Sequence, residues 1–199
     1  MFQQLVLASG NQGKLTELAQ LLAGLSISMQ PQSVFGVQDA EETGRSFVEN
    51  ALIKARHACE ATGLPALADD SGLVVPALGG APGIHSSRYA GNSGDAVANN
   101  AKLLAAMRDF SGEQRSCYFY CVLALMRHTD DPTPLIAEGR LHGCLAASPA
   151  GENGFGYDPL VCLPGSDTRI AQLTDKEKNR ISHRGQALNR LLERLKQEA

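Results

Sequence analysis

The chain has 199 residues, of which 43% are hydrophobic and 20% are charged, and its formal net charge is -3 at pH 7. This composition is typical of an ordinary globular protein, and the length fits one large domain or two small ones. Cations are scattered among acids, which argues against binding of duplex nucleic acid, because that requires a basic surface. Any polyanion site must be local, which favours a small anionic ligand.

The sequence also predicts a cytoplasmic protein without a membrane segment. Residues 1–5 lack a charged stretch followed by an apolar one, and no apolar run is long enough to span a bilayer. The five cysteines show no C-x-x-C spacing, so we expect reduced, mostly buried thiols and neither disulfides nor zinc. They are Cys59, Cys117, Cys121, Cys144 and Cys162.

Residues 4–22 predict a strand, a glycine-rich loop and a helix. The loop, residues 9–14, leaves backbone N–H groups at a helix N-terminus, and Lys14 adds a positive charge. Phosphate binding is the natural hypothesis. The spacing is not that of the Walker loop, because Leu15 follows the lysine, and an ordinary glycine turn is the alternative.

A second strand is predicted at residues 26–29, followed by a loop over residues 31–45 that carries Glu41 and Glu42. Ser46 and Glu49 form a capping box that opens a helix, which Gly63 ends. Asn50 and Lys54 lie on one shoulder of this helix, beside its apolar stripe. A solvated acidic loop and a surface lysine are the alternatives to a functional role.

The stretch Ala66-Leu67-Ala68-Asp69-Asp70-Ser71-Gly72 is an apolar run that stops at polar residues. We expect the strand to turn at Ser71 and Gly72. Because alternate side chains of a strand point to opposite faces, Asp69 and Asp70 cannot both lie in the core, and the turn exposes at least one. A carboxylate at the carboxyl end of a buried strand is typical of active sites in α/β sheets, although an Asx turn is the alternative.

Residues 116–127 and 135–145 predict a pair of strands joined as a hairpin. A second glycine-rich loop, residues 151–159, carries Phe155, Tyr157 and Asp158. Glycines beside an exposed aromatic ring allow a planar base to stack close to the backbone. A packed surface loop is the alternative.

The C-terminal part predicts a short helix opened by Thr174 and carrying Lys178, then a longer helix from residue 183. His183 and Arg184 stand at the start of that helix, where the dipole disfavours cations. Such a pair suggests an anionic or carbonyl ligand, with a simple salt bridge as the alternative.

Seven motifs, in this order, resemble the inosine triphosphate pyrophosphatase family, bacterial dITP/XTP type. They span residues 9–185 and are S-G-N-x-x-K, E-E-T-G, S-F-V-E-N-A-x-x-K-A, A-D-D-S-G-L, G-G-A-P-G-I-x-S-x-R-Y, G-F-G-Y-D-P and E-K-x-x-I-S-H-R-G. Ser87 departs from the pattern, which usually has Ala there, and His85 stands at a variable position. Neither position touches the chemistry.

The resemblance implies an elongated, two-lobed α/β fold about a long twisted mixed sheet flanked by helices, with an active-site cleft between the lobes of one domain, residues 1–199. It implies a homodimer that hydrolyses dITP, ITP, XTP and dXTP to the monophosphate and pyrophosphate with Mg2+. It also implies site residues at matching positions. Asp70 is the expected proton acceptor; the expected metal ligands are Glu42 and Asp70, with Asp69 and Glu41 as helpers; the expected substrate contacts are Ser9, Gly10, Asn11, Gln12, Gly13, Lys14, Asn50, Lys54, Ser71, Phe155, Gly156, Tyr157, Asp158, Lys178, His183 and Arg184.

The residue types agree with this chemistry. Mg2+ takes carboxylates and phosphate oxygens, and lysines stabilise a leaving pyrophosphate. Arg184 can only donate, which suits a 6-oxo purine better than adenine. A non-catalytic nucleotide sensor, another metal-dependent nucleotide phosphatase and covalent catalysis through Ser71 are the alternatives.

Overall fold

The computed structural model describes residues 3–22, 28–92 and 94–197. Its strands are β1 (Gln4–Ala8), β2 (Ser28–Pro31), β3 (Ala66–Val74), β4 (Ser116–Met126), β5 (Leu135–Leu145) and β6 (Val161–Cys162). Its α-helices are α1 (Gln12–Leu22), α2 (Phe47–Thr62), α3 (Ala96–Ala106), α4 (Asp175–Ile181) and α5 (His183–Gln197). Among these described helices, none is long and apolar enough to cross a membrane.

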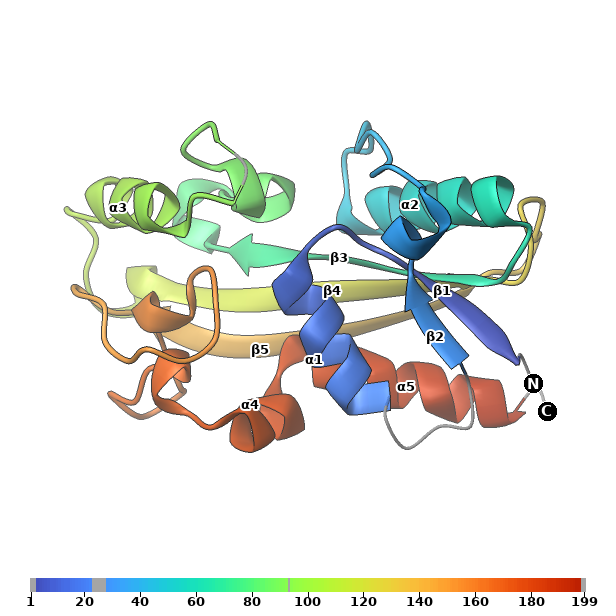
Figure 1. The fold of residues 1–199 in the computed structure, drawn as a ribbon. Coiled ribbons are helices and arrows are strands. Elements are labelled where there is room, and N and C mark those ends of the chain that lie inside the picture. The colour runs from blue at the N-terminus through green and yellow to red at the C-terminus, as the bar shows by residue number, and fades with distance from the viewer. Residues whose placement is uncertain (1–2, 23–27, 93, 198–199) are drawn as a thin grey trace. The chain divides into compact units, whose positions relative to one another are not determined.

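The six described strands form one mixed sheet in the order β2-β1-β3-β4-β5-β6, and β1 to β5 are labelled in Figure 1. β1 pairs in parallel with β2 and β3, whereas β5 and β6 are antiparallel. The expected α/β class with a mixed sheet and flanking helices is therefore confirmed. The strand expected at residues 26–29 falls partly outside the described residues, and within them β2 begins at Ser28.

The chain divides into two compact units. The first draws on the ranges 1–70, 121–139 and 184–199, and the second on 71–120 and 140–183. Both units share strands of the sheet, since β3, β4 and β5 each contribute residues to the two ranges.

Helices cover both faces of the sheet in the first unit. On one face, α1 and α5 pack against the strands through buried leucines and alanines, among them Leu18, Leu22, Ala187, Leu188 and Leu191. On the other face lies α2, whose Ala51, Ala55 and Ala58 are completely buried (Figure 1). α2 begins and ends as predicted, because the Ser46 side chain accepts a hydrogen bond from the Glu49 N–H and Gly63 adopts a left-handed conformation.

The second unit has its own apolar core beneath α3. Its members come from β3 to β6, from α3 and from segments that adjoin these elements, and they are Leu73, Val75, Leu103, Met107, Cys117, Phe119, Leu141, Leu145, Tyr157, Leu160, Val161 and Ile170. Burial of large side chains like these is the main favourable term in folding. The loop at residues 151–159 is thus attached to a packed core through Tyr157.

The expected turn at Ser71 and Gly72 is wrong. β3 continues without interruption from Ala66 to Val74. The reason lies at Gly72, where an added Cβ would stand 2.3 Å from Ser86 Oγ and 2.5 Å from the Gly83 carbonyl oxygen. The missing side chain lets a neighbouring segment approach β3, and Ser86 Oγ accepts a hydrogen bond from the Leu73 N–H at 2.9 Å. Glycine serves close packing here, and not a turn.

Candidate active site

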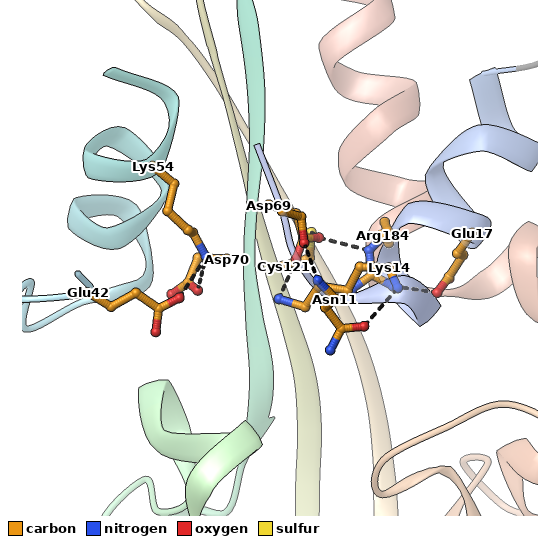
Figure 2. Close-up of polar contacts among 10 residues, drawn as sticks. Asn11, Lys14, Glu17, Glu42, Lys54, Asp69, Asp70, Cys121 and Arg184 are labelled. Atoms are coloured by element: carbon orange, nitrogen blue, oxygen red, sulfur yellow. Dashed lines mark hydrogen bonds and ion pairs between the residues drawn. The ribbon is translucent and has the colours of Figure 1, made fainter. Parts of the chain in front are cut away.

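Asp69 and Asp70 are both buried, with exposed fractions of 1% and 5%. The expectation that one of them is exposed is therefore wrong. The alternation along β3 does hold, since the two side chains point to opposite faces of the strand, each toward its own set of partners (Figure 2). Buried carboxylates are tolerated when cations and donors compensate them, and both have such partners.

Asp70 lies with Lys54 and Glu42. The Lys54 Nζ is 2.7 Å from Asp70 Oδ1 and 2.9 Å from Glu42 Oε1 (Figure 2). The Lys54 side chain thus points toward the buried Asp70 and the partly exposed Glu42, and it is not a solvated surface lysine. Burial lowers the pKa of Lys54, but the charges of Asp70 and Glu42 outweigh this and raise it, so the ammonium is charged.

The pKa of Asp70 is raised, because burial disfavours the carboxylate more than Lys54 favours it. Its second oxygen, Oδ2, is buried and has no hydrogen-bond partner among the described groups. A buried oxygen without a partner is costly unless a ligand compensates it. The Asp70 and Glu42 carboxylates are hard oxygen donors that fit Mg2+, which takes one or two carboxylates and completes its shell with phosphate oxygens and water.

Two further predicted site residues near Asp70 and Glu42, Asn50 and Glu41, differ in burial. Asn50 is completely buried, and its Oδ1 accepts a hydrogen bond from the Gly44 N–H at 2.9 Å, so it fixes the loop that carries Glu42. Glu41 is exposed, on the same loop. Within the described residues, no group of three His, Cys, Asp or Glu side chains is arranged to hold a metal ion by itself. A substrate would have to supply further ligands.

On the opposite face of β3, the partners of Asp69 include Lys14, Arg184 and Cys121. Its Oδ1 lies 2.7 Å from Lys14 Nζ, and its Oδ2 lies 2.8 Å from Arg184 Nε and 3.1 Å from Cys121 Sγ (Figure 2). Burial raises the pKa of Asp69, but the charges of Arg184 and Lys14 outweigh it and hold that pKa well below its usual range. Asp69 is therefore a permanent anion between two cations.

Arg184 is also paired with Glu17 of α1 through Nη1. Its side chain is 1% exposed. Burial and the neighbouring charge of Asp69 together raise the pKa of the Cys121 thiol well above its ordinary value, so Cys121 acts as a neutral donor. This cluster joins β3, β4, α1 and α5 by charge-assisted hydrogen bonds.

The chain passes from β1 through a short loop into α1, as predicted, but the helix begins within the predicted loop of residues 9–14. Asn11 organises it, because its Oδ1 accepts the Lys14 N–H at 3.0 Å and its own N–H donates to Ser9 Oγ at 3.2 Å. α1 begins at Gln12, so Gln12, Gly13 and Lys14 occupy its first turn. An added Cβ at Gly10 would lie 2.3 Å from Asp39 Oδ2, which shows how closely that carboxylate approaches the loop.

The second unit gathers Phe155, Asp158 and Lys178. Asp158 Oδ2 accepts hydrogen bonds from the Phe155 N–H at 2.9 Å and from Lys178 Nζ at 2.8 Å. The same ammonium lies 4.5 Å from the centre of the Phe155 ring, which is 37% exposed. Gly154 is required beside them, because its φ is +73° and an added Cβ would meet Asp158 Oδ2 at 2.1 Å. An exposed ring next to a fixed cation and carboxylate can hold a planar heterocycle.

Tyr157 and His183 are both buried. Tyr157 is 4% exposed, and its hydroxyl donates to the Ser86 carbonyl at 2.9 Å, while burial raises its pKa. His183 stacks on Phe119 at 5.0 Å between ring centres. The Gly156 carbonyl accepts a hydrogen bond from Asn100 at 3.0 Å. The contacts of Tyr157 and Gly156 fix the loop, whereas the Phe155 ring is partly exposed. Ser71 lies on β3 with intermediate exposure.

Several residues of the site were missed in the sequence. Glu17 and Cys121 belong to the Asp69 cluster, and Asn100 supports the loop at residues 151–159. Of these three residues, only Glu17 could have been found from the sequence, because it stands three residues after Lys14 on the same helical face. Cys121 looks like any core residue of a strand, and the contact of Asn100 depends on a residue 56 positions away.

Buried acids, paired lysines and a loop at a helix N-terminus define a class of sites that bind phosphorylated ligands with a divalent ion. Comparison with known proteins identifies the family. The family model described as "Ham1 family" matches residues 5–194, so the chain belongs to the Ham1 family. The resemblance drawn from the seven motifs is confirmed.

Close relatives agree in name and in fold. The chain is 56% identical over 192 residues to the dITP/XTP pyrophosphatase of Thioalkalivibrio sulfidiphilus, covering 96% of this chain and 98% of that protein. It is 53% identical over 194 residues to the dITP/XTP pyrophosphatase of Yersinia pseudotuberculosis, covering 98% of both. The solved structure of a HAM1 protein from Coxiella burnetii is similar with a TM-score of 0.90 and 51% identity, over 100% of both chains.

Proposed function

We propose that the chain hydrolyses non-standard purine nucleoside triphosphates, namely dITP, ITP, XTP and dXTP, to the monophosphate and pyrophosphate. The observation that carries this proposal is the Asp70 cluster, in which a buried carboxylate oxygen without a described partner stands beside the Lys54 ammonium. The names of the relatives support the reaction class. A metal-dependent phosphatase of another specificity would need the same cluster. The residues that contact the purine base therefore determine which nucleotide is hydrolysed.

We propose Glu42 and Asp70 as the residues that hold Mg2+, which lowers the pKa of bound water and neutralises phosphate charge when it is present. Asp70 accepts the proton of the attacking water, and its raised pKa suits a base better than an ordinary aspartate. Lys54 and Lys14 stabilise the negative charge on the leaving pyrophosphate. The amides of residues 9–14 bind the phosphates at the start of α1.

For Asp69 and Arg184, the contacts support roles that differ from the expected ones. Both oxygens of Asp69 are engaged by cations and a thiol, so we propose that it fixes Lys14 and does not bind the metal. Arg184 Nε and Nη1 face Asp69 and Glu17. We therefore propose that Arg184 holds Asp69 in place and so helps to position Lys14 for phosphate binding. We also propose that Lys178 donates to the 6-oxo group of a base stacked on Phe155.

We further propose a single catalytic domain over residues 1–199, a homodimer and a cytoplasmic location, all from the family resemblance. Light scattering coupled to size exclusion tests the dimer. The proposal expects twice the chain mass of 21.1 kDa, and a particle of 21.1 kDa would contradict it.

The reaction is tested by incubating the protein with ITP, dITP, XTP, ATP and GTP in the presence of Mg2+, and by measuring phosphate and pyrophosphate separately. We expect pyrophosphate from the oxo-purine nucleotides and much slower release from ATP. Tight nucleotide binding without turnover would identify a sensor, and release of orthophosphate would identify another phosphatase.

A further inference from the structure

The second unit holds three thiols that the proposed reaction does not use: Cys117 of β4, Cys144 of β5 and Cys162 of β6. Cys144 and Cys162 are direct partners in the antiparallel ladder between β5 and β6. Partners across a ladder carry their side chains on the same face of the sheet. The two thiols therefore project to the same side of neighbouring strands.

The ladder also fixes the spacing of this pair. The Ala146 N–H donates to the Leu160 carbonyl at 2.8 Å, so Ala146 and Leu160 form a hydrogen-bonded pair. Hydrogen-bonded and non-bonded pairs alternate along an antiparallel ladder, which makes Cys144 and Cys162, two positions further on, a hydrogen-bonded pair as well. The Cα atoms of such pairs are about 5.5 Å apart, a separation at which disulfides commonly form.

Small molecules can reach these thiols. Cys144 and Cys162 both line a surface pocket of about 430 Å³, together with Ser166, Asp167 and Arg169. Cys144 has intermediate exposure, Cys162 is 7% exposed and Cys117 is 2% exposed. Burial raises the pKa of Cys117 to about 12, and burial also raises that of Cys162, where Arg169 partly opposes it. Cys144 is thus the thiol that an oxidant meets first.

We propose that Cys144 and Cys162 are a disulfide-forming pair that a hydroperoxide oxidises. The Cys144 thiolate attacks one peroxide oxygen, the O–O bond breaks, and Cys144 becomes a sulfenic acid as the first water leaves. The Cys162 sulfur then attacks the Cys144 sulfur, the S–O bond breaks, and the second water leaves. Two thiols lose two electrons and two protons, and hydrogen peroxide is reduced to two waters.

The bond has a structural consequence, because it closes a ring over residues 144–162. This ring contains the loop with Phe155 and Asp158. The disulfide adds a covalent link between the two ends of that loop, which the ladder between β5 and β6 already pairs in the reduced protein. The inference is independent of the proposed reaction, since it concerns only the thiols and the pairing of β5 with β6.

The experiment is oxidation of the full chain with hydrogen peroxide, alkylation of the remaining thiols, and tryptic mass spectrometry without reduction. Trypsin separates the thiols well, since residues 57–88 carry Cys59, residues 116–127 carry Cys117 and Cys121, and residues 141–169 carry both Cys144 and Cys162. We expect peptide 141–169 to lose two hydrogens and to take no alkyl group. Dithiothreitol should restore two alkylation sites.

Matched variants define the outcome. Cys144→Ser and Cys162→Ser should each abolish the internal bond, whereas Cys117→Ser and Cys59→Ser should keep it. Retained protection of buried Cys59 and Cys121 from alkylation shows that the fold is intact. A link between peptides 116–127 and 141–169, sulfinic acid at Cys144 without a bond, or two unreacted thiols in 141–169 would each overturn the proposal.

Discussion

Neutralising Asp69 should destabilise the fold and neutralising Asp70 should not, although the two residues are adjacent. The pKa of Asp69 is lowered by its cationic partners, so its charged form stabilises the fold at neutral pH. The pKa of Asp70 is raised, chiefly by burial, so its charged form costs folding free energy at neutral pH. Asn is close in size to Asp, so both substitutions remove mainly the charge.

The magnitudes follow from the partners. Asp69→Asn removes the ion pairs of Asp69 with Lys14 and with Arg184, while the pair of Arg184 with Glu17 stays, and breaking such a buried network costs about 3–5 kcal/mol. For a chain of this length, that lowers the melting temperature by roughly 6–20 °C. In Asp70→Asn, Lys54 keeps Glu42 at 2.9 Å, so we expect an unchanged or higher melting temperature.

The assay is thermal unfolding of both variants at pH 7 with a chelator, so that bound metal does not contribute to stability. Urea unfolding gives the free-energy difference independently of the melting temperature. Turnover of ITP with Mg2+ completes the comparison, since Asp70→Asn should lose at least about 10²-fold, the typical contribution of a general base. A stability loss in Asp70→Asn equal to that in Asp69→Asn would refute the reasoning.

Three further predictions concern other parts of the chain. Phe155→Leu should raise KM for ITP and ATP alike by roughly 5- to 150-fold in steady-state kinetics, because base stacking contributes about 1–3 kcal/mol; an unchanged KM would exclude the ring from binding. Gly72→Ala should cost about 1–3 kcal/mol in urea unfolding, because its Cβ would overlap Ser86 Oγ, and full stability would contradict that packing. Hydrogen bonds from the Arg127 and Thr133 N–H groups hold the pKa of Asp131 below 3.8 against the effect of burial, so its stabilisation is complete above that pH and is lost as pH falls through the folded value; equal acid sensitivity of wild type and Asp131→Asn would contradict this.

Local patterns predicted much of the fold. The capping box at Ser46 predicted the start of α2, and the apolar spacing that follows predicted the helix itself. Gly63, a residue typical of helix C-termini, predicted its end. The order of strand, loop and helix over residues 4–22 was correctly predicted, although α1 begins at Gln12, inside the predicted loop. These features depend on interactions within a few residues of each other, which a sequence displays directly.

The burial of Asp69 could not be predicted in the same way. Its partner Arg184 is 115 positions away, and Arg184 in turn pairs with Glu17, 167 positions away. Without these partners, burial of the Asp69 charge is too costly, so the residues near it in the sequence predict an exposed turn. The role of Gly72 likewise depends on Ser86, which only the tertiary structure brings to β3.

The central claim is that water attacks the α-phosphorus and that pyrophosphate leaves in one piece. Hydrolysis of ITP in ¹⁸O-labelled water, followed by mass spectrometry of the products during the time course, tests it most directly. The account predicts one labelled oxygen in IMP, unlabelled pyrophosphate and no IDP at any time. Label in pyrophosphate would place the attack at the β-phosphorus, and IDP with free orthophosphate would show attack at the γ-phosphorus; either result would contradict the roles given to Asp70, Lys54 and Lys14.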